Sequence, residues 1–286
     1  MREPARPRLA LVLGSGGVRS VAALGVAEVL HREGIRPDLL VGCSAGALFG
    51  ATLAMGHDTA HALQLATQLW TADITRQHRW NAIPRMVWPR LGRFDADFSL
   101  RDDRLIMARL NDAFGNTQLE DLQTPLRVTA TDAASGQAVV VRRGRVVDAL
   151  RASLAMPFMF APQTIEGCRL IDGFVSDPLP VSAAADAATV LAMGFDAPMP
   201  YRIDGPSRLL AQVTSAMTNN LMHARLAAAE LGGMRLLRVF PRLNRRIGLF
   251  ETDAMPYLVQ EGRLAAEQQL PALIRLMERP PHLLAA

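Results

Sequence analysis

Five consecutive apolar residues, Leu9 to Leu13, end abruptly at Gly14-Ser15-Gly16-Gly17, and this junction constrains the fold more than any other part of the chain. A short apolar run bounded by glycine is typical of a strand that is buried on both faces of a parallel sheet. We expect a helix from about Val18 to Glu33 and a second strand from Asp38 to Val41. Parallel strands that alternate with helices build a layered α/β domain, so the start of the chain already predicts that class.

The remainder of the chain continues the same alternation. We expect one domain over residues 1–286, because the chain is long enough for a large core and contains no internal repeat and no linker rich in Pro, Gly or Ser. Residues 71–100 are predicted to be an irregular insertion. Further helices are predicted at about 47–55, 57–70, 101–114, 206–231 and 255–277, and further strands at 127–131, 138–141, 169–171, 189–193 and 235–240.

A second glycine-flanked junction follows the second strand and matches the pattern GxSxG. Its residues are Gly42-Cys43-Ser44-Ala45-Gly46. A serine in a tight turn between strand and helix is exposed at the carboxyl edge of the sheet, and the helix N-terminus beside it favours developing negative charge. The motif therefore predicts Ser44 as a nucleophile, with a simple Gly-Ser turn as the alternative. We expect Cys43 to be a small packing residue rather than a reactive thiol.

The first glycine-rich loop has three interpretations: a plain connector between strand and helix, a dinucleotide-binding loop, and an oxyanion hole. The dinucleotide pattern GxGxxG requires a third glycine where Arg19 stands, which argues against it. Consecutive backbone N–H groups at a helix N-terminus form a concavity for an anionic oxygen. Because the first two strands are expected to be neighbours, this loop would lie beside Ser44, and we favour the oxyanion hole.

A serine nucleophile needs a base, and two arrangements are open. The order Ser44, Asp172, His223 would match an α/β-hydrolase triad. However, only one strand precedes Ser44, and His223 lies within a predicted helix rather than on a loop. Asp172 by itself is the alternative base, although an aspartate followed by glycine at the end of a strand is also common in simple turns.

Four motifs support the second arrangement by their order and spacing. They are Leu13–Arg19, Gly34–Ser44, Ala152–Pro157 and Asp172–Val181. Together they resemble the motifs of bacterial patatin-like phospholipases, which are related to the catalytic domains of neuropathy-target-esterase-type lysophospholipases, and residues 257–266 resemble the closing helix of that family. The resemblance covers nearly the whole chain. It implies a three-layer α/β/α patatin-like fold with a central, mostly parallel sheet.

The resemblance implies a catalytic dyad without histidine. In the family an aspartate acts directly on the serine, so Ser44 would attack an acyl ester and Asp172 would accept its proton. No metal or organic cofactor is implied. The residues that would form the oxyanion and substrate-binding loop are Gly16, Gly17, Val18 and Arg19.

Three positions depart from the family's pattern. Ser15 replaces the first glycine of the loop, and Ser20 stands where the family favours Gly or Lys. Both serines are small, so we expect the backbone path of the loop to be preserved. Phe174 follows Asp172-Gly173 in place of a small residue, and its ring would narrow the site or turn into the core, which bears on substrate size.

The predicted insertion has a composition that suits a lipid surface. Residues 76–93 contain five arginines together with Trp80 and Trp88, and no acidic residue. Tryptophan rings favour the headgroup level of a membrane, and guanidinium groups bind phosphate. We expect a lid or a lipid-facing loop here, with an exposed insertion packed on the main body as the alternative.

Charge and composition argue against several other classes. All 31 basic residues are arginine, but the net charge is only +4 and no basic repeat, zinc-finger spacing or RNA-binding signature occurs, so we expect no nucleic-acid partner. No set of His, Asp and Glu has metal-ligand spacing. The sequence contains no run of about 18 apolar residues that would span a bilayer. With two cysteines that fit a reducing compartment, we expect a cytoplasmic protein that binds peripherally at the inner membrane surface.

The function predicted from the sequence is hydrolysis of phospholipid or lysophospholipid acyl esters through an acyl-Ser44 intermediate. Two alternatives stay open. One is a general carboxylesterase or thioesterase that acts on soluble acyl groups, and the other is a catalytically impaired lipid-binding protein whose site is blocked by Phe174.

Overall fold

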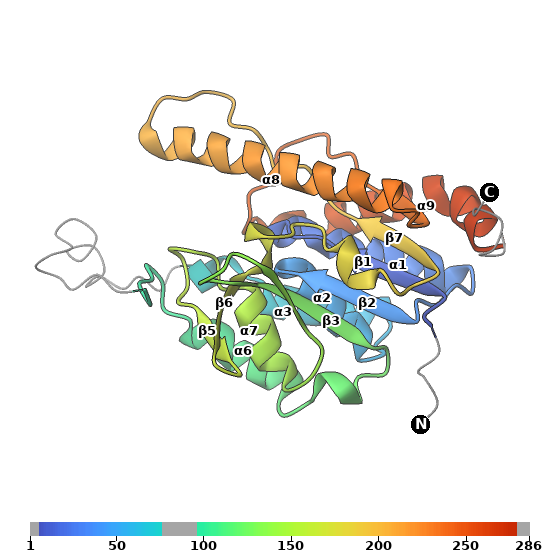
Figure 1. Cartoon of the computed structure of the whole chain (residues 1–286), viewed down its shortest axis with the longest axis horizontal. Helices are drawn as coiled ribbons and strands as arrows, with labels where there is room; N and C mark the ends of the chain where they lie inside the picture. Colours follow the sequence, from blue (N-terminus) through green and yellow to red (C-terminus); the bar gives the residue numbers. More distant parts are fainter. Residues whose placement is uncertain (1–5, 76–95, 279–286) are drawn as a thin grey trace, which may run out of the picture.

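The computed structural model describes residues 6–75 and 96–278, which contain one eight-stranded sheet with helices on both faces (Figure 1). The strands are β1 (Leu9–Leu13), β2 (Leu39–Cys43), β3 (Leu126–Asp132), β4 (Ala138–Val141), β5 (Gln163–Ile165), β6 (Cys168–Asp172), β7 (Thr189–Met193) and β8 (Leu236–Val239). They lie in the order β5-β6-β3-β2-β1-β7-β8, and β4 pairs with β3.

The centre of the sheet is parallel. β1 pairs with β2 and β7, β2 with β3, and β7 with β8, all in parallel, and Val12 lies opposite both Val41 and Ala192. Antiparallel pairings occur only around β3 to β6 among the described strands. The predicted mostly parallel sheet is therefore confirmed, and the carboxyl ends of β1 and β2 meet at one edge.

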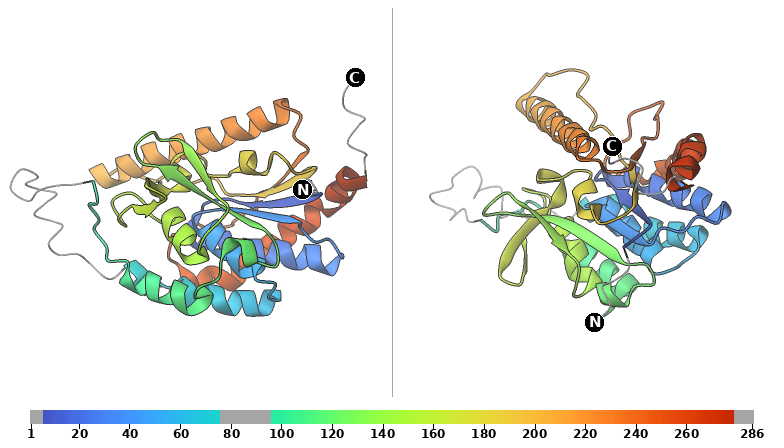
Figure 2. Two further views of the ribbon diagram at one scale, coloured as in Figure 1. Left: turned by 60° about the horizontal axis from the view of Figure 1, so that its bottom comes forward. Right: turned by 45° about the vertical axis from the view of Figure 1, so that its right-hand side comes forward.

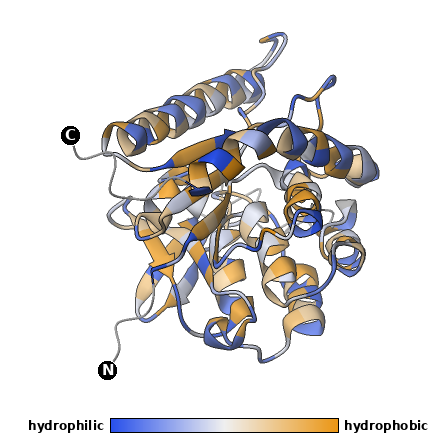
Figure 3. Cartoon of the chain, turned by 90° about the vertical axis from the view of Figure 1, so that its right-hand side faces the viewer, coloured by the Kyte–Doolittle hydropathy of each residue, from blue (hydrophilic) through white to orange (hydrophobic). Residues whose placement is uncertain are grey.

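Helices form a layer on each side of this sheet (Figure 2). Successive side chains of a strand point to opposite faces, so Leu9, Leu11 and Leu13 pack on one layer while Ala10 and Val12 pack on the other. The first layer contains α1 (Ala22–Arg32), α2 (Ala45–Ala54), α3 (Thr59–Leu69), α6 (Arg104–Phe114), α7 (Val146–Ser153) and α9 (Met255–Glu278). The second contains α8 (Pro206–Leu231) and the segment around η5 (Val181–Ala184). Hydrophobic residues accordingly gather on the strands (Figure 3).

Two elements were missed in the sequence, and each has a physical reason. α7 is only eight residues long, which is too short for a helical period to stand out in the sequence. β5 is only three residues long. The predicted first helix begins with a 3-10 turn, η1 (Gly17–Val21), before α1. The remaining short turns are η2 (Ala72–Thr75), η3 (Leu119–Asp121), η4 (Gly173–Val175) and η6 (Thr252–Ala254).

Membrane contact was expected mainly in the insertion at 71–100. Trp80, Trp88 and the arginines between residues 76 and 93 lie outside the described residues. Within residues 6–75 and 96–278, every helix is too short or too polar to cross a bilayer.

Candidate active site

Ser44 lies at the carboxyl end of β2, in the turn that joins β2 to α2. Its backbone has φ 54° and ψ −128°, which is strained for a residue with a side chain and fits a nucleophile turn. The flanking glycines allow this turn to pack closely. A Cβ at Gly42 would lie 2.3 Å from Ala47, and a Cβ at Gly46 would lie 2.5 Å from the carbonyl of Leu13.

Asp172 ends β6 and directly contacts Ser44. Ser44 Oγ donates a hydrogen bond of 2.7 Å to Asp172 Oδ2, although 128 residues separate the two in sequence. The other carboxylate oxygen, Oδ1, accepts the backbone N–H of Phe174 at 3.0 Å. Asp172 is only 1% exposed. One oxygen is thus anchored while the other faces the hydroxyl of Ser44.

The surroundings of Asp172 change its basicity. Burial raises the pKa of Asp172 to about 7, although the hydrogen bonds from the Phe174 N–H and the Ser44 hydroxyl oppose this shift. A carboxylate with an ordinary pKa of about 3.9 is a weak base at neutral pH. Desolvation therefore makes this carboxylate a stronger base in the neutral range.

Cys43 precedes Ser44 in the same turn. Burial, with the nearby charge of Asp172, raises the pKa of the Cys43 thiol well above its usual value. The thiol is fully buried and stays protonated at neutral pH, so it serves as a packing residue.

Ser153, at the end of α7, supports the turn from behind. The backbone N–H of Ser44 donates to Ser153 Oγ at 2.7 Å, and Ser153 Oγ donates to the carbonyl of Thr129 at 2.7 Å. The Ser44 N–H is therefore engaged and does not point to an open site. We assigned no role to Ser153 from the sequence; the only signal was its place in the motif at 152–157.

The glycine-rich loop after β1 lies beside the turn of Ser44, because β1 and β2 are neighbours. Arg19 is buried and donates from Nε to the carbonyl of Gly16 at 3.1 Å and from Nη1 to the carbonyl of Asp196 at 3.0 Å. The carbonyl of Gly16 and the N–H of Gly17 belong to one trans peptide and point to opposite sides. Because Arg19 binds this carbonyl, the N–H of Gly17 points away from Arg19. The N–H groups of Gly16 and Gly17 donate to no acceptor within the described part of the chain.

Leu249 and Phe250 cover this loop, which differs from the open oxyanion hole that we expected. The N–H of Val18 donates to the carbonyl of Leu249 at 2.9 Å, and Trp70 Nε1–H donates to the same oxygen at 3.0 Å. The ring of Phe250 stacks on that of Trp70, with 5.3 Å between centroids and 8° between planes. The N–H of Val18 therefore already donates to a carbonyl of the chain itself. No local pattern in the sequence pointed to Leu249 or Phe250.

The space left beside Ser44 is a small, apolar cavity of about 20 Å³. This is room for about one water molecule. Phe174 is half-buried and is not part of this lining, so its ring does not narrow this cavity. The cavity is lined by Ser44, Trp70, Ile74, Ile106, Leu154, Met156, Met159, Phe160, Asp172 and Phe250.

The structure places His223 away from the dyad. His223 lies on α8, is half exposed, and its Nε2 bonds to Asp196 Oδ1 at 2.7 Å. Asp172 is bonded to Ser44 directly. The arrangement therefore lacks the serine–histidine contact on which the triad alternative depends.

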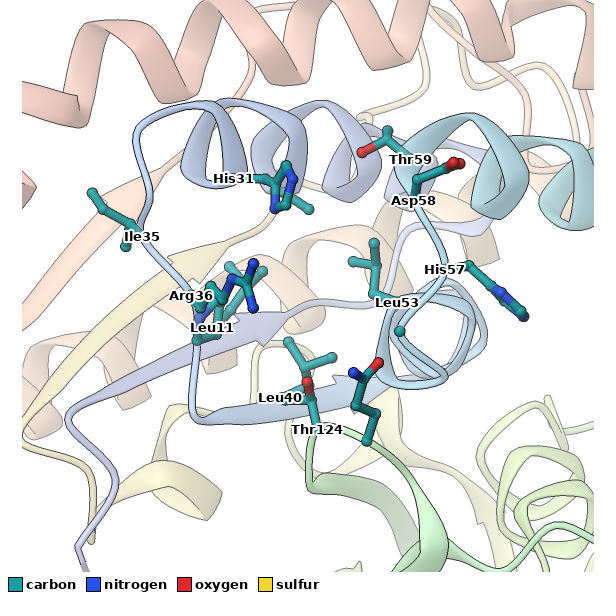
Figure 4. Close-up of a pocket in the computed structure, with 14 residues that line it drawn as sticks. Leu11, His31, Ile35, Arg36, Leu40, Leu53, His57, Asp58, Thr59 and Thr124 are labelled. Carbon is teal, nitrogen blue, oxygen red and sulfur yellow. The ribbon is translucent and has the colours of Figure 1, made fainter.

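A larger cavity of about 550 Å³ lies at the opposite edge, where β1 and β2 begin (Figure 4). Leu53 and the turn after it, at the C-terminal end of α2, line this cavity, whereas Ser44 precedes the N-terminal end of α2. His31 and Arg36 belong to its lining, and no serine or cysteine of the described residues does. The larger cavity therefore does not lie at the end of the molecule that carries the Ser44–Asp172 pair. In the described ranges, no group of three His, Cys, Asp or Glu could hold a metal ion.

Fold and site together define a three-layer α/β/α protein with a serine–aspartate pair at the carboxyl edge of its sheet. Residues 11–185 match the family model of patatin-like phospholipases, and the chain belongs to this family.

The chain is also similar to individual proteins, over part of their length. The chain is 31% identical over 242 residues to an NTE family protein of Mycobacterium tuberculosis. This alignment covers 83% of this chain and 62% of the relative. The chain is also 27% identical over 180 residues to Lysophospholipase NTE1 of Cryptococcus neoformans. That alignment covers 61% of this chain and 10% of the fungal protein. The chain thus spans less than two thirds of these relatives' length. The crystal structure of VipD from Legionella pneumophila aligns with 94% of this chain and 67% of VipD, at 13% identity and a TM-score of 0.49.

Proposed function

We propose that this chain is a lipid acyl hydrolase that cleaves phospholipid or lysophospholipid acyl esters with Ser44 as nucleophile and Asp172 as base. One observation carries the proposal: the 2.7 Å hydrogen bond from Ser44 Oγ to a buried carboxylate whose pKa is raised to about 7. Membership of the patatin-like phospholipase family and the name of the fungal relative support an ester of a lipid as the substrate class.

In the first half of the reaction, Ser44 Oγ attacks the ester carbonyl carbon and passes its proton to Asp172 Oδ2. The carbonyl oxygen becomes an oxyanion, which the N–H groups of Gly16 and Gly17 would bind. When the tetrahedral intermediate collapses, the C–O bond to the alcohol breaks, and the leaving alcohol takes the proton from Asp172. An acyl-Ser44 ester remains.

In the second half, water replaces the alcohol. Asp172 removes a proton from the water as it attacks the acyl carbon, and the oxyanion forms again in the same place. Collapse then breaks the bond to Ser44 Oγ, which recovers its proton from Asp172 and releases the fatty acid. The protein ends in the state in which it began, without a cofactor in either half.

Substrate must first displace the cover formed by Leu249 and Phe250. The cavity of about 20 Å³ has no room for an acyl chain, and the carbonyl of Leu249 occupies the N–H of Val18. Once that segment moves, Val18 becomes a third oxyanion donor, and the apolar side chains around Trp70 and Phe160 are available to contact the acyl chain.

A fluorophosphonate probe and a lysophospholipid assay test this proposal together. We expect the wild type to be labelled, Ser44→Ala not to be labelled, and both Ser44→Ala and Asp172→Asn to lose about a thousandfold or more in turnover. Ser135→Ala, at an exposed turn serine, is the matched control and should retain full activity. Full activity in Asp172→Asn would exclude the dyad. Absence of labelling in a folded wild type would favour a non-catalytic lipid-binding protein.

The same preparations separate lipid from soluble substrates. We expect kcat/KM for a lysophospholipid to exceed that for a short soluble ester, because the lining around Ser44 is apolar. The reverse order would favour the general carboxylesterase or thioesterase.

A further inference from the structure

The N-terminal half of α8 stands away from the body of the protein. The fully buried residues of α8, Met222 and Leu226, both lie in its C-terminal half. In the other half, Leu210 is 64% and Met217 is 67% exposed, and Leu209 and Val213 are also exposed. These four residues recur at helical spacing, and Figure 3 shows hydrophobic bands along α8. This half of the helix thus presents apolar side chains to solvent.

The loop before α8 extends the same apolar surface. Tyr201 is 85% exposed, and Met199 and Ile203 are also exposed. Exposed apolar side chains that gather in one region, rather than singly, are typical of an interaction site.

Arginines border this patch. In the loop between β8 and η6, Arg246 donates to the carbonyl of Met199, and its guanidinium lies 5.5 Å from the ring centroid of Tyr201. Arg242, Arg245 and Arg246, with the buried Arg19, line a cavity of about 340 Å³. The basic loop and the apolar patch are therefore one continuous face.

The charge of this face is positive. Asp204 is paired with Arg208, and Glu251 with Arg245. Arg202 and Arg242 have no hydrogen bond or ion pair with any described residue. Unpaired guanidinium groups beside exposed apolar side chains suit a bilayer with anionic headgroups, where the apolar groups enter the interface and arginine binds phosphate.

The position of the face matches the position of the dyad. The chain leaves the carboxyl end of β7 and runs beside α8, where Asn219 and Ser215 bond to the backbone of Ala197 and Pro198. The N-terminal half of α8 therefore projects beyond the edge of the sheet that carries Ser44 (Figures 1 and 2). Arg19 belongs both to the glycine-rich loop and to the lining of the basic cavity.

We propose that residues 199–217 and the loop 242–246 form a face that docks on an anionic lipid surface. This proposal deepens the proposed function, because it presents the site of Ser44 to substrate in a bilayer. A symmetric contact between two copies fits the face less well, since it would oppose the unpaired arginines of both copies.

Vesicle flotation of the full chain tests the docking face. The Ser44→Ala background removes hydrolysis, and the vesicles contain phosphatidylcholine either alone or with phosphatidylglycerol. We expect binding to the anionic vesicles, and roughly tenfold weaker binding for Leu210→Ser/Met217→Ser, which removes two inserted side chains. Arg202→Gln/Arg242→Gln should lose most of the preference for anionic vesicles. The matched controls are Leu231→Ser, at a residue 90% exposed at the far end of α8, and the exposed Arg143→Gln.

Two results would overturn the docking face. One is vesicle binding by Leu210→Ser/Met217→Ser equal to that of Leu231→Ser. The other is a dimer in solution that this double variant abolishes while vesicle binding stays unchanged. Hydrolysis of a short soluble ester is measured separately with Leu210→Ser/Met217→Ser in a chain that keeps Ser44. The rate of this double variant should equal the wild-type rate. A wild type that does not hydrolyse the ester would contradict the proposed function but not the docking face.

Discussion

In the proposed reaction Asp172 must be a base strong enough to take a serine proton, yet it is buried where a negative charge is costly. Burial itself supplies the basicity, because desolvation raises the pKa of this carboxyl to about 7. The hydrogen bond from the Phe174 N–H limits the shift, so that the ionised form is still available near neutral pH.

The pH dependence of turnover follows from this pKa. Only the ionised form of Asp172 could accept a proton in the proposed reaction, so we expect kcat/KM for a soluble ester to rise with pH and to level off above about pH 7. An exposed aspartate as base would give a plateau from about pH 5 upward. Initial rates measured across this range distinguish the two, and a flat profile through neutral pH would contradict the assignment.

Stability should show the opposite trend. Between about pH 4 and about pH 7 the folded state holds a proton on Asp172 that the unfolded state has lost, so ionisation of Asp172 lowers stability as the pH rises. We expect Asp172→Asn, which removes the buried charge, to be more stable than the wild type at pH 8 by roughly 2 kcal/mol, and about equal near pH 4.

Chemical denaturation at both pH values measures this difference. Asp132→Asn is the control, because hydrogen bonds from Ser135 and the Ala134 N–H lower the pKa of Asp132, so its replacement should bring no gain. A variant Asp172→Asn that is less stable than the wild type at pH 8 would contradict the raised pKa.

At the scale of elements, the cover on the site comes from the segment between β8 and η6. The carbonyl of Leu249 accepts the N–H of Val18, which we propose as a donor to the substrate oxygen, and the ring of Phe250 lines the cavity beside Ser44. The elements that position the serine are buried, whereas Leu249 and Phe250 contact them through the two hydrogen bonds to the Leu249 carbonyl and the stack of Phe250 on Trp70.

Shortening the cover should open the site. We expect Phe250→Ala to react faster with a fluorophosphonate, because the ring that stacks on Trp70 no longer shields Ser44. Loss of that partly buried ring should also cost roughly 2 kcal/mol of stability. Leu243→Ala, in the same segment but outside the lining of the small cavity, is the control and should leave the labelling rate unchanged. An unchanged or lower rate for Phe250→Ala would show that the cover does not limit access.

At the scale of the whole molecule, α9 is joined to the start of the chain by a close helix crossing with α1. A Cβ at Gly25 would lie 2.0 Å from the carbonyl of Val259, and a Cβ at Gly262 would lie 2.0 Å from the carbonyl of Ala22. Each helix therefore approaches the backbone of the other where only glycine fits.

We expect Gly25→Ala to destabilise the protein by roughly 3 kcal/mol or more, because the added methyl group meets backbone rather than a movable side chain. Gly205→Ala is the control, since nothing lies within 4 Å of its added Cβ and its φ of −174° is extended backbone that any residue adopts. Thermal unfolding of both variants checks this prediction. Equal stability of the two would mean that α9 does not pack on α1 as described.

Much of the fold was predictable because its signals are local. The apolar runs at Leu9–Leu13 and Thr189–Met193 have the bounds observed for β1 and β7, and the periodic stretch Pro206–Leu231 has the bounds of α8. Elements too short for a periodic signal were missed, such as α7 with eight residues and β5 with three. The turn of Ser44 was predictable because strand, glycines and helix are adjacent in sequence.

By itself, the sequence determined a layered α/β fold, a serine turn at the carboxyl edge of the sheet, and a short set of candidate bases. Only the tertiary structure decided that Asp172 lies 2.7 Å from Ser44 while His223 bonds to Asp196. It alone also decided that the carbonyl of Leu249 accepts the N–H of Val18 and that the N-terminal half of α8 exposes its apolar side chains. The reason is physical: propensity and periodicity act over a few neighbouring residues, whereas contacts between distant segments, and the burial that sets a pKa, exist only after the chain has packed.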